Sequence, residues 1–197
     1  MKVFTFKQAV AQVTKGKFFE DKKILKLHDK NGWTVAHEQA KRGWTTEDKE
    51  ILKLCDKYGV SVAYEQARHG WTTEDKEILK LCNKSGTSVA HIQARYGWTT
   101  EDKEILKLRN KYGTSVAHEQ AYRGWVTEDP EILVLTTISN FLVAKVQACY
   151  SGWTPEGETR EKFVQELQKN FPVEKVQEIL YDIDDLAKKY FKKILLE

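Results

Sequence analysis

Histidine and cysteine are the residue types in this chain best suited to chemistry, because both can ligate metals and take part in catalysis. His28, Cys55 and Cys82 are spaced 27 residues apart. Residues separated by one structural repeat lie too far apart to share a zinc ion, whose ligands sit about 2.0–2.3 Å from the metal. The sequence contains no CxxC, HExxH, P-loop or GxSxG motif. We therefore expect no metal site, no cofactor and no enzymatic activity.

Lysines form the most regular charged pattern. They recur at positions i, i+4 and i+8, as at Lys49, Lys53 and Lys57, in successive copies of a 27-residue unit. Such a face suits a polyanion such as nucleic acid. It also suits a solvated face, because acidic residues recur beside the lysines and the net charge is only +3. The candidate polyanion-binding residues are Lys26, Lys30, Lys53, Lys57, Lys80, Lys84, Lys107 and Lys111.

A second set of candidates differs from copy to copy, whereas the core and cap positions barely change. A uniform scaffold with one varied face is typical of repeat proteins that recognise a specific partner, and tyrosine and arginine are frequent in binding hot spots. The histidine or tyrosine of this set could instead have a structural role, because its position flanks the core and its side chain could form a hydrogen bond to the neighbouring repeat. The candidate partner-binding residues are His37, Lys41, Tyr64, Arg68, His91, Arg95, His118 and Tyr122.

Two further ladders follow the same spacing. We expect the tryptophans to pack across the joints between copies rather than to stack on bases. Glutamines recur on the apolar side, where a buried amide must be hydrogen-bonded, so we expect them to bond backbone in the neighbouring unit. The ladders are Trp44, Trp71, Trp98 and Trp125, and Gln12, Gln39, Gln66, Gln93, Gln120 and Gln147.

The fixed 27-residue period predicts a solenoid, in which each unit buries its apolar face against its neighbours. Each copy contains two short helices. Helix A follows an aspartate N-cap, which Pro130 after Asp129 locates, since proline favours the first helical position. Helix B follows a serine or threonine N-cap such as Ser61. Residues 1–31 are a degraded copy, full copies begin at Gly32, Gly59, Gly86 and Gly113, and an eroded copy begins at Asn140.

The start of helix B resembles the opening half of an ankyrin repeat, whose pattern is D-x-x-G-x-T-P-L-H-x-A-A-x-x-G. Here the matching residues are Asp29, Gly32, Thr34, His37, Ala40 and Gly43, and the match recurs from Asp56, Asn83 and Asn110. Val-Ala replaces Pro-Leu, and the unit has 27 residues instead of about 33. The resemblance implies an ankyrin-like fold and a role in protein–protein recognition.

The C-terminal segment departs from the repeat. The pattern predicts one amphipathic helix over residues 159–171 and another from Pro172 towards Leu196, with an apolar stripe along it. So long a stripe must be buried, either as a cap on the solenoid or against another chain. The cap is favoured, because the lysine positions become apolar or proline in the last copy, at Pro130, Val134 and Ile138.

These observations predict an all-α, right-handed helical-repeat solenoid over residues 1–153 with a C-terminal helical cap over residues 154–197. We expect a recognition scaffold that binds another protein through helix B, with nucleic-acid binding through the lysines as the alternative. Three scattered cysteines and the absence of a long apolar run predict a reduced, cytoplasmic protein that does not bind membranes. We expect a monomer, with a homodimer through residues 173–196 as the alternative.

Overall fold

A computed structural model describes residues 4–196, and every regular element in that range is a helix. The chain divides into two compact units, with the boundary between Tyr96 and Gly97. Unit 1 holds α1 (Phe6–Thr14), α2 (Lys22–Leu25), α3 (Val35–Ala40), α4 (Lys49–Leu52), α5 (Val62–Arg68), α6 (Lys76–Leu79) and α7 (Val89–Arg95). Unit 2 holds α8 (Lys103–Leu106), α9 (Val116–Ala121), α10 (Pro130–Leu133), α11 (Val143–Ser151), α12 (Gly157–Gln168) and α13 (Val173–Ile194).

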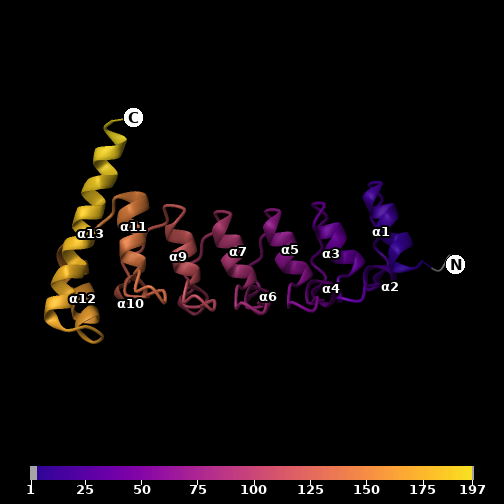
Figure 1. Ribbon diagram of the computed structural model, residues 1–197, viewed down its shortest axis with the longest axis horizontal. Helices are drawn as coiled ribbons and strands as arrows, with labels where there is room; N and C mark the ends of the chain where they lie inside the picture. The colour runs from indigo at the N-terminus through magenta and orange to yellow at the C-terminus, as the bar shows by residue number, and fades with distance from the viewer. Residues whose placement is uncertain (1–3, 197) are drawn as a thin grey trace. The chain divides into compact units, whose positions relative to one another are not determined.

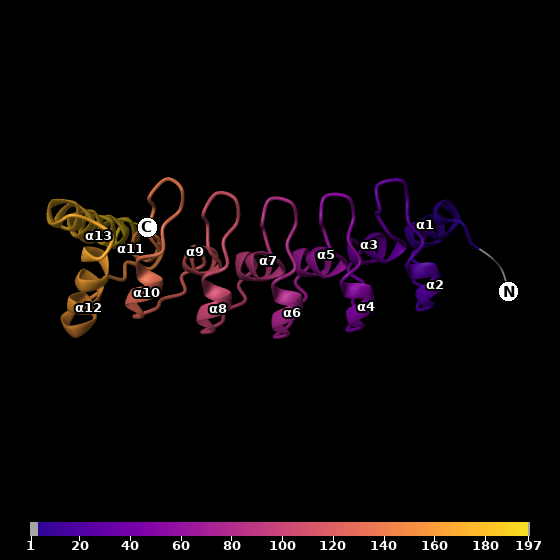
Figure 2. The same cartoon turned by 90° about the horizontal axis from the view of Figure 1, so that it is seen from below.

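Both units are built by stacking pairs of short helices (Figure 1). In unit 1, α2, α4 and α6 are helices A and form one row, while helices B, namely α3, α5 and α7, form a second row (Figure 2). Unit 2 repeats the arrangement with α8 and α10 as helices A and α9 and α11 as helices B. Consecutive helices B pack on each other within each unit. The predicted all-α helical repeat is confirmed.

Helix A is a single turn that depends on its aspartate cap. A helix of four residues is unstable alone, because the free-energy cost of nucleating it exceeds the stabilisation from one turn of hydrogen bonds. The Asp75 carboxylate accepts a 2.9 Å hydrogen bond from the Glu77 amide, and Asp129 caps a helix that begins at Pro130. The predicted caps are confirmed at Asp21, Asp48, Asp75, Asp102 and Asp129.

A tight turn links each helix A to the next helix B. The Asp56 carboxylate accepts hydrogen bonds from the Tyr58 and Val60 amides at 2.8 and 2.9 Å. Gly59 has φ +76°, a left-handed conformation that favours glycine. Adjacent turns are also joined, because the Lys57 amide donates a 2.8 Å hydrogen bond to the carbonyl of Asn31, one repeat earlier. The turns therefore fix the distance between repeats.

The core of each unit lies between its two rows of helices. Ile51 and Leu52 of α4 and Val62 of α5 are fully or almost fully buried, and the same positions are buried in the other full repeats. The apolar pattern of Ile51, Leu52 and Leu54 continues to Cys55, but Cys55 is exposed. It lies in the turn after the helix has ended, where the helical register no longer directs it inward.

The two C-terminal helices cover the last repeat of unit 2. Phe163 and Leu167 of α12 and Ile179 and Ile183 of α13 are buried in one cluster with residues of α10 and α11. Val134, which replaces a lysine of the earlier repeats, packs against this cluster. Arg160 and Asp184 join α12 to α13 through two hydrogen bonds of 3.0 and 2.9 Å. The predicted C-terminal helical cap is confirmed.

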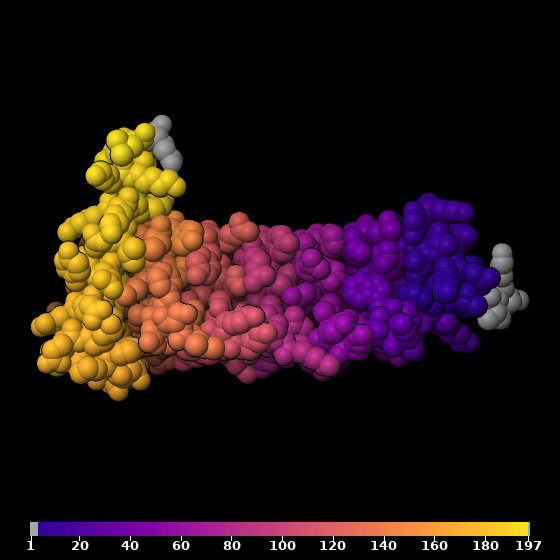
Figure 3. Space-filling model, in the orientation of Figure 1, coloured from indigo at the N-terminus to yellow at the C-terminus, as the bar shows by residue number. Residues whose placement is uncertain are grey.

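The apolar stripe of α13 is not buried along its whole length, which corrects the expectation that it must be. Val173 at its start and Phe191 near its end are 56% and 54% exposed, and Leu195 is 85% exposed. The last turns of α13 stand clear of the rest of unit 2 (Figure 3, yellow). The stripe is covered only where α11 and α12 lie beneath it.

The proposed boundary between a repeat domain (1–153) and a C-terminal segment (154–197) stays a prediction. The last two helices belong to the same compact unit as α8 to α11. Across residues 4–196, no helix is both long and apolar enough to cross a membrane.

Candidate recognition surface

The histidines of helix B are internal hydrogen-bonding groups. His37, His91 and His118 are all fully buried, so the prediction that they lie on an outward face is wrong. His37 Nε2 donates to the Val60 carbonyl of the next repeat at 2.9 Å, and His118 Nε2 donates to the Phe141 carbonyl at 2.9 Å. The structural alternative for this slot is confirmed.

Each of these histidines also completes the cap of its own helix. The His37 amide donates to Thr34 Oγ1 at 3.2 Å, and His37 Nδ1 accepts from the Thr34 amide at 3.2 Å and from its hydroxyl at 2.7 Å. Because Nε2 donates and Nδ1 accepts, the neutral imidazole is the form that fits. Burial lowers the pKa of His37, although the bond to Val60 and the charge of Asp56 act in the opposite direction.

Tyr64 occupies the same slot in another copy and is half-buried. Its hydroxyl accepts a 3.4 Å hydrogen bond from the Asn83 amide of the next repeat, and burial raises its pKa. Glu65, one residue later, is buried and bonded to Arg68 at 3.2 Å. The slot therefore belongs to the joint between repeats whether it holds histidine or tyrosine.

The exposed part of the predicted face is the C-terminal end of each helix B. Lys41, Arg68, Arg95 and Tyr122 are all exposed there. The neighbouring position is equally exposed and equally varied, and sequence reasoning missed it although it directly follows each candidate. It holds Arg42, His69, Tyr96, Arg123 and Tyr150. In unit 2 the rings of Tyr122 and Tyr150 meet edge to face at 5.2 Å.

The first two lysines of the sets at α2, α4 and α8 are ion-paired to the next repeat within the same unit. In unit 1, Lys22 lies 2.5 Å from Asp48, and Lys26 and Lys53 contact Glu50 and Glu77. Unit 2 repeats the pattern with Lys103 on Asp129 at 2.5 Å and Lys107 on Glu131 at 2.8 Å. These lysines therefore form contacts between neighbouring repeats. Lys80 occupies the same position in the repeat of α6.

These exposed pairs shift the pKa values of their members in opposite directions. The hydrogen bond from Lys22 lowers the pKa of Asp48 and, in return, raises the pKa of Lys22. The hydrogen bond from Lys49 to Asp75 likewise lowers the pKa of Asp75 and raises the pKa of Lys49. Both effects favour the charged forms.

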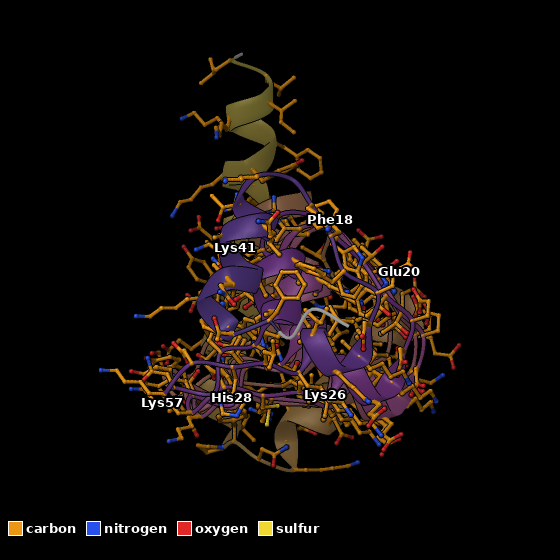
Figure 4. The ribbon with its side chains drawn as sticks, turned by 90° about the vertical axis from the view of Figure 1, so that its right-hand side faces the viewer. Phe18, Glu20, Lys26, His28, Lys41 and Lys57 are labelled. Atoms are coloured by element: carbon orange, nitrogen blue, oxygen red, sulfur yellow. The ribbon has the colours of Figure 1, made fainter. Side chains whose placement is uncertain are left out.

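The third lysine of each set lies in the turn and has no carboxylate partner among the described residues. Lys57 Nζ instead donates a 2.8 Å hydrogen bond to the Asn31 side chain and lies 4.9 Å from the Tyr58 ring centre. Lys111 lies over Tyr112 at the same distance, and Lys30 and Lys84 are exposed. Figure 4 shows that Lys57 and Lys41 lie at different edges of unit 1.

The glutamine and tryptophan ladders hold repeats together, as expected. The Gln39 amide accepts from the Phe19 backbone N–H at 2.8 Å and donates to the Phe19 carbonyl at 3.1 Å. Gln66, with its amide oriented to satisfy both groups, pairs with Thr46 in the same way. Trp44, Trp71 and Trp125 are half-buried and pack against the core clusters.

No cluster of three potential metal ligands occurs between residues 4 and 196. All three thiols are free, and partial burial raises the pKa of Cys55 and of Cys149. A raised pKa leaves less of the reactive thiolate at neutral pH.

Comparison with known proteins adds no assignment. No protein-family model matches the chain, and no curated protein matches it significantly.

Proposed function

We propose that this protein is a non-catalytic scaffold that recognises another protein through the exposed C-terminal ends of its helices B. The observation that carries the proposal is a contrast between two classes of position. The uniform positions are engaged in joining the repeats, as Gln39 and Asp48 are. The varied positions at the C-terminal ends of helices B, such as Lys41, Arg68 and Tyr122, are exposed. Variation at these exposed positions gives each repeat a distinct contribution to one surface.

The residue types on this surface also support a protein partner. Arg68, His69 and Tyr96 lie at the ends of α5 and α7, and Tyr122 and Tyr150 form an exposed aromatic pair in unit 2. Arginine and tyrosine are enriched among residues that dominate protein–protein affinity. The ankyrin-like resemblance of the turn and cap, which implies protein recognition, belongs to the same proposal. So does a cytoplasmic, monomeric protein without enzymatic activity.

Site-specific photo-crosslinking tests the proposal. A photoreactive phenylalanine is placed at Arg68 or at Tyr122. Matched controls carry it at Thr72 or Thr99, which are exposed in the return loops, the segments that lead from a helix B to the next helix A. Nuclease-treated lysate is irradiated and adducts are identified by mass spectrometry. We expect one protein to be captured from both test positions and from neither control. Equal capture at the controls, or none at any position, would contradict the proposal.

A second candidate function is polyanion binding through fewer lysines than the sequence suggests. The observation in its favour is that the turn lysines, Lys30, Lys57, Lys84 and Lys111, are exposed without a carboxylate partner within the described chain. The ion-paired lysines are weaker candidates, because a polyanion would have to displace an existing carboxylate. Affinity that falls steeply with salt would support this function.

A further inference from the structure

A tryptophan and a glutamate tie consecutive return loops together. In unit 1, Trp71 Nε1 donates a 2.8 Å hydrogen bond to Glu47 Oε1. In unit 2, Trp125 Nε1 donates a 3.2 Å hydrogen bond to Glu101 Oε1. Each tryptophan follows the end of a helix B, and each glutamate precedes the helix A of the previous repeat. This contact closes the surface between one repeat and the next.

The last joint of unit 2 lacks this contact. Trp153 and Glu128 occupy the equivalent positions, but an extra residue before Gly152 separates them by 25 residues rather than 24. Within the described chain no hydrogen bond joins them. The chain continues into α12 and α13, and Phe191 of α13 packs against Gly152. A surface cleft of about 570 Å³ opens at this point, lined by Glu128, Trp153, Glu156, Asp184, Lys188 and Phe191.

The cleft has an acidic wall. Glu128 and Glu156 are exposed, and neither is paired with a basic group in residues 4–196. Asp184 is already neutralised by its two hydrogen bonds to Arg160. Lys188 contributes one positive charge, so the unpaired groups of the lining sum to one negative charge. An incoming monocation would balance it.

The cleft also has aromatic walls. Trp153 is half-buried and packs against the cluster of α11, α12 and α13, while Phe191 is more than half exposed. Indole and phenyl faces attract cations, most strongly where carboxylates supply charge nearby. The volume falls in the range of roughly 300–1,000 Å³ at which proteins hold small organic groups.

We propose that this cleft binds an organic monocation, namely the guanidinium or ammonium group of a basic side chain or of a small amine. The cation lies against the rings of Trp153 and Phe191 and donates charge-assisted hydrogen bonds to the carboxylates of Glu128 and Glu156. The cleft lies at a joint of the described chain where no Trp–Glu hydrogen bond, such as those of Trp71 and Trp125, links the two loops. It does not depend on the helix B surface proposed above.

The indole N–H signal of Trp153 in a proton–nitrogen NMR spectrum, assigned with Trp153→Phe, reports on binding. The full chain is titrated with N-acetylarginine methylamide, with tetramethylammonium chloride and with N-acetylcitrulline methylamide, the neutral isostere of the first probe. We expect the arginine probe to shift this signal with a dissociation constant on the order of 1–10 mM. The double variant Glu128→Gln, Glu156→Gln should weaken binding by at least about fivefold.

The repeat supplies a matched control. Glu101 stands at the position of Glu128 but is engaged by Trp125, so Glu101→Gln should leave the titration unchanged. A stronger response to the arginine probe indicates a polypeptide side chain as the ligand, and a stronger response to tetramethylammonium indicates a small amine. An equal response to citrulline, no shift at Trp153, or full binding by the double variant overturns the proposal. None of these results bears on the crosslinking experiment.

Discussion

At the scale of single residues, a side chain that looks like a recognition group can be fully occupied with structure. His37 satisfies its own N-cap and the Val60 carbonyl of the next repeat at the same time. Its sequence position carried both signals, because it lies three residues after Thr34 and varies between histidine and tyrosine among the copies. Spacing from the cap was the better guide, since a residue three positions after an N-cap can reach back to it.

We predict that the stability of unit 1 falls as the pH drops below about 6.5, the ordinary pKa of histidine. The folded state lowers the pKa of His37, so the unfolded chain takes up the proton first. The stabilisation is complete above the unfolded pKa and is lost as the pH falls towards the folded one. Protonation would also set two donors, Nδ1 and the Thr34 amide, against each other. Titration of the His37 ring by NMR, together with urea unfolding from pH 7.5 to 5, measures both effects.

Two variants isolate this contribution. His37→Leu removes the titrating group and leaves buried polar groups unpaired, so it should lower stability at pH 7.5 by about 2–4 kcal/mol. It should also reduce the difference in stability between pH 7.5 and pH 5. His69→Leu changes an exposed histidine of the same unit and should alter neither quantity appreciably. An unchanged pH dependence in His37→Leu would assign the effect to other groups.

At the scale of elements, each four-residue helix A is held by its neighbours. Helix α4 has one aspartate cap, one buried pair of aliphatic side chains and an ion pair from Lys49 to Asp75 of the next repeat. The sequence predicted the caps, since Pro130 marked the helix start in one copy and the strict spacing carried it to the others. It did not predict how short the helix is, because Leu54 and Cys55 continue the apolar pattern after the backbone has turned.

The glycines of the turns provide a prediction at this scale. Gly113 has φ +74°, and an added Cβ would lie 2.8 Å from the Ile138 amide, whose bond to Tyr112 joins two turns. Gly124 has φ +86° but open space around it. Both changes to alanine incur the left-handed cost of about 1–2 kcal/mol. Gly113→Ala should cost about 1–3 kcal/mol more, because the adjoining backbone must move.

Urea unfolding of the two alanine variants, followed by circular dichroism, measures the difference. Both glycines lie in unit 2, so the comparison is made within one compact unit. The Ile138 amide signal should move in Gly113→Ala and stay in place in Gly124→Ala. Equal losses of stability would mean that the backbone at Ile138 moves aside at no cost in free energy.

At the scale of the whole molecule, the sequence predicted the repeat but not how much of the apolar stripe of α13 is buried. The period fixed the caps, the glutamine ladder and the core, because each position appears several times. The burial of α13 could not be predicted in the same way. Its stripe continues through Phe191 and Leu195, yet α11 ends at Ser151 and covers only part of it. A pattern shows which face is apolar, whereas the length of the neighbouring helix decides how much of that face is covered.

The distribution of charge over the molecule gives the last prediction. If the chain binds heparin, the affinity should depend on the turn lysines, because the helix A lysines already contact carboxylates such as Glu77 and Glu131. Replacing Lys57, Lys84 and Lys111 by glutamine should reduce the slope of log affinity against log salt by up to about 2–3. The matched triple replacement of Lys26, Lys53 and Lys107 should change the slope by less than 1. The two variants remove the same formal charge, so equal slopes would show that bulk charge governs binding, whereas a larger effect of the second variant would show that the ion pairs open to receive the polyanion.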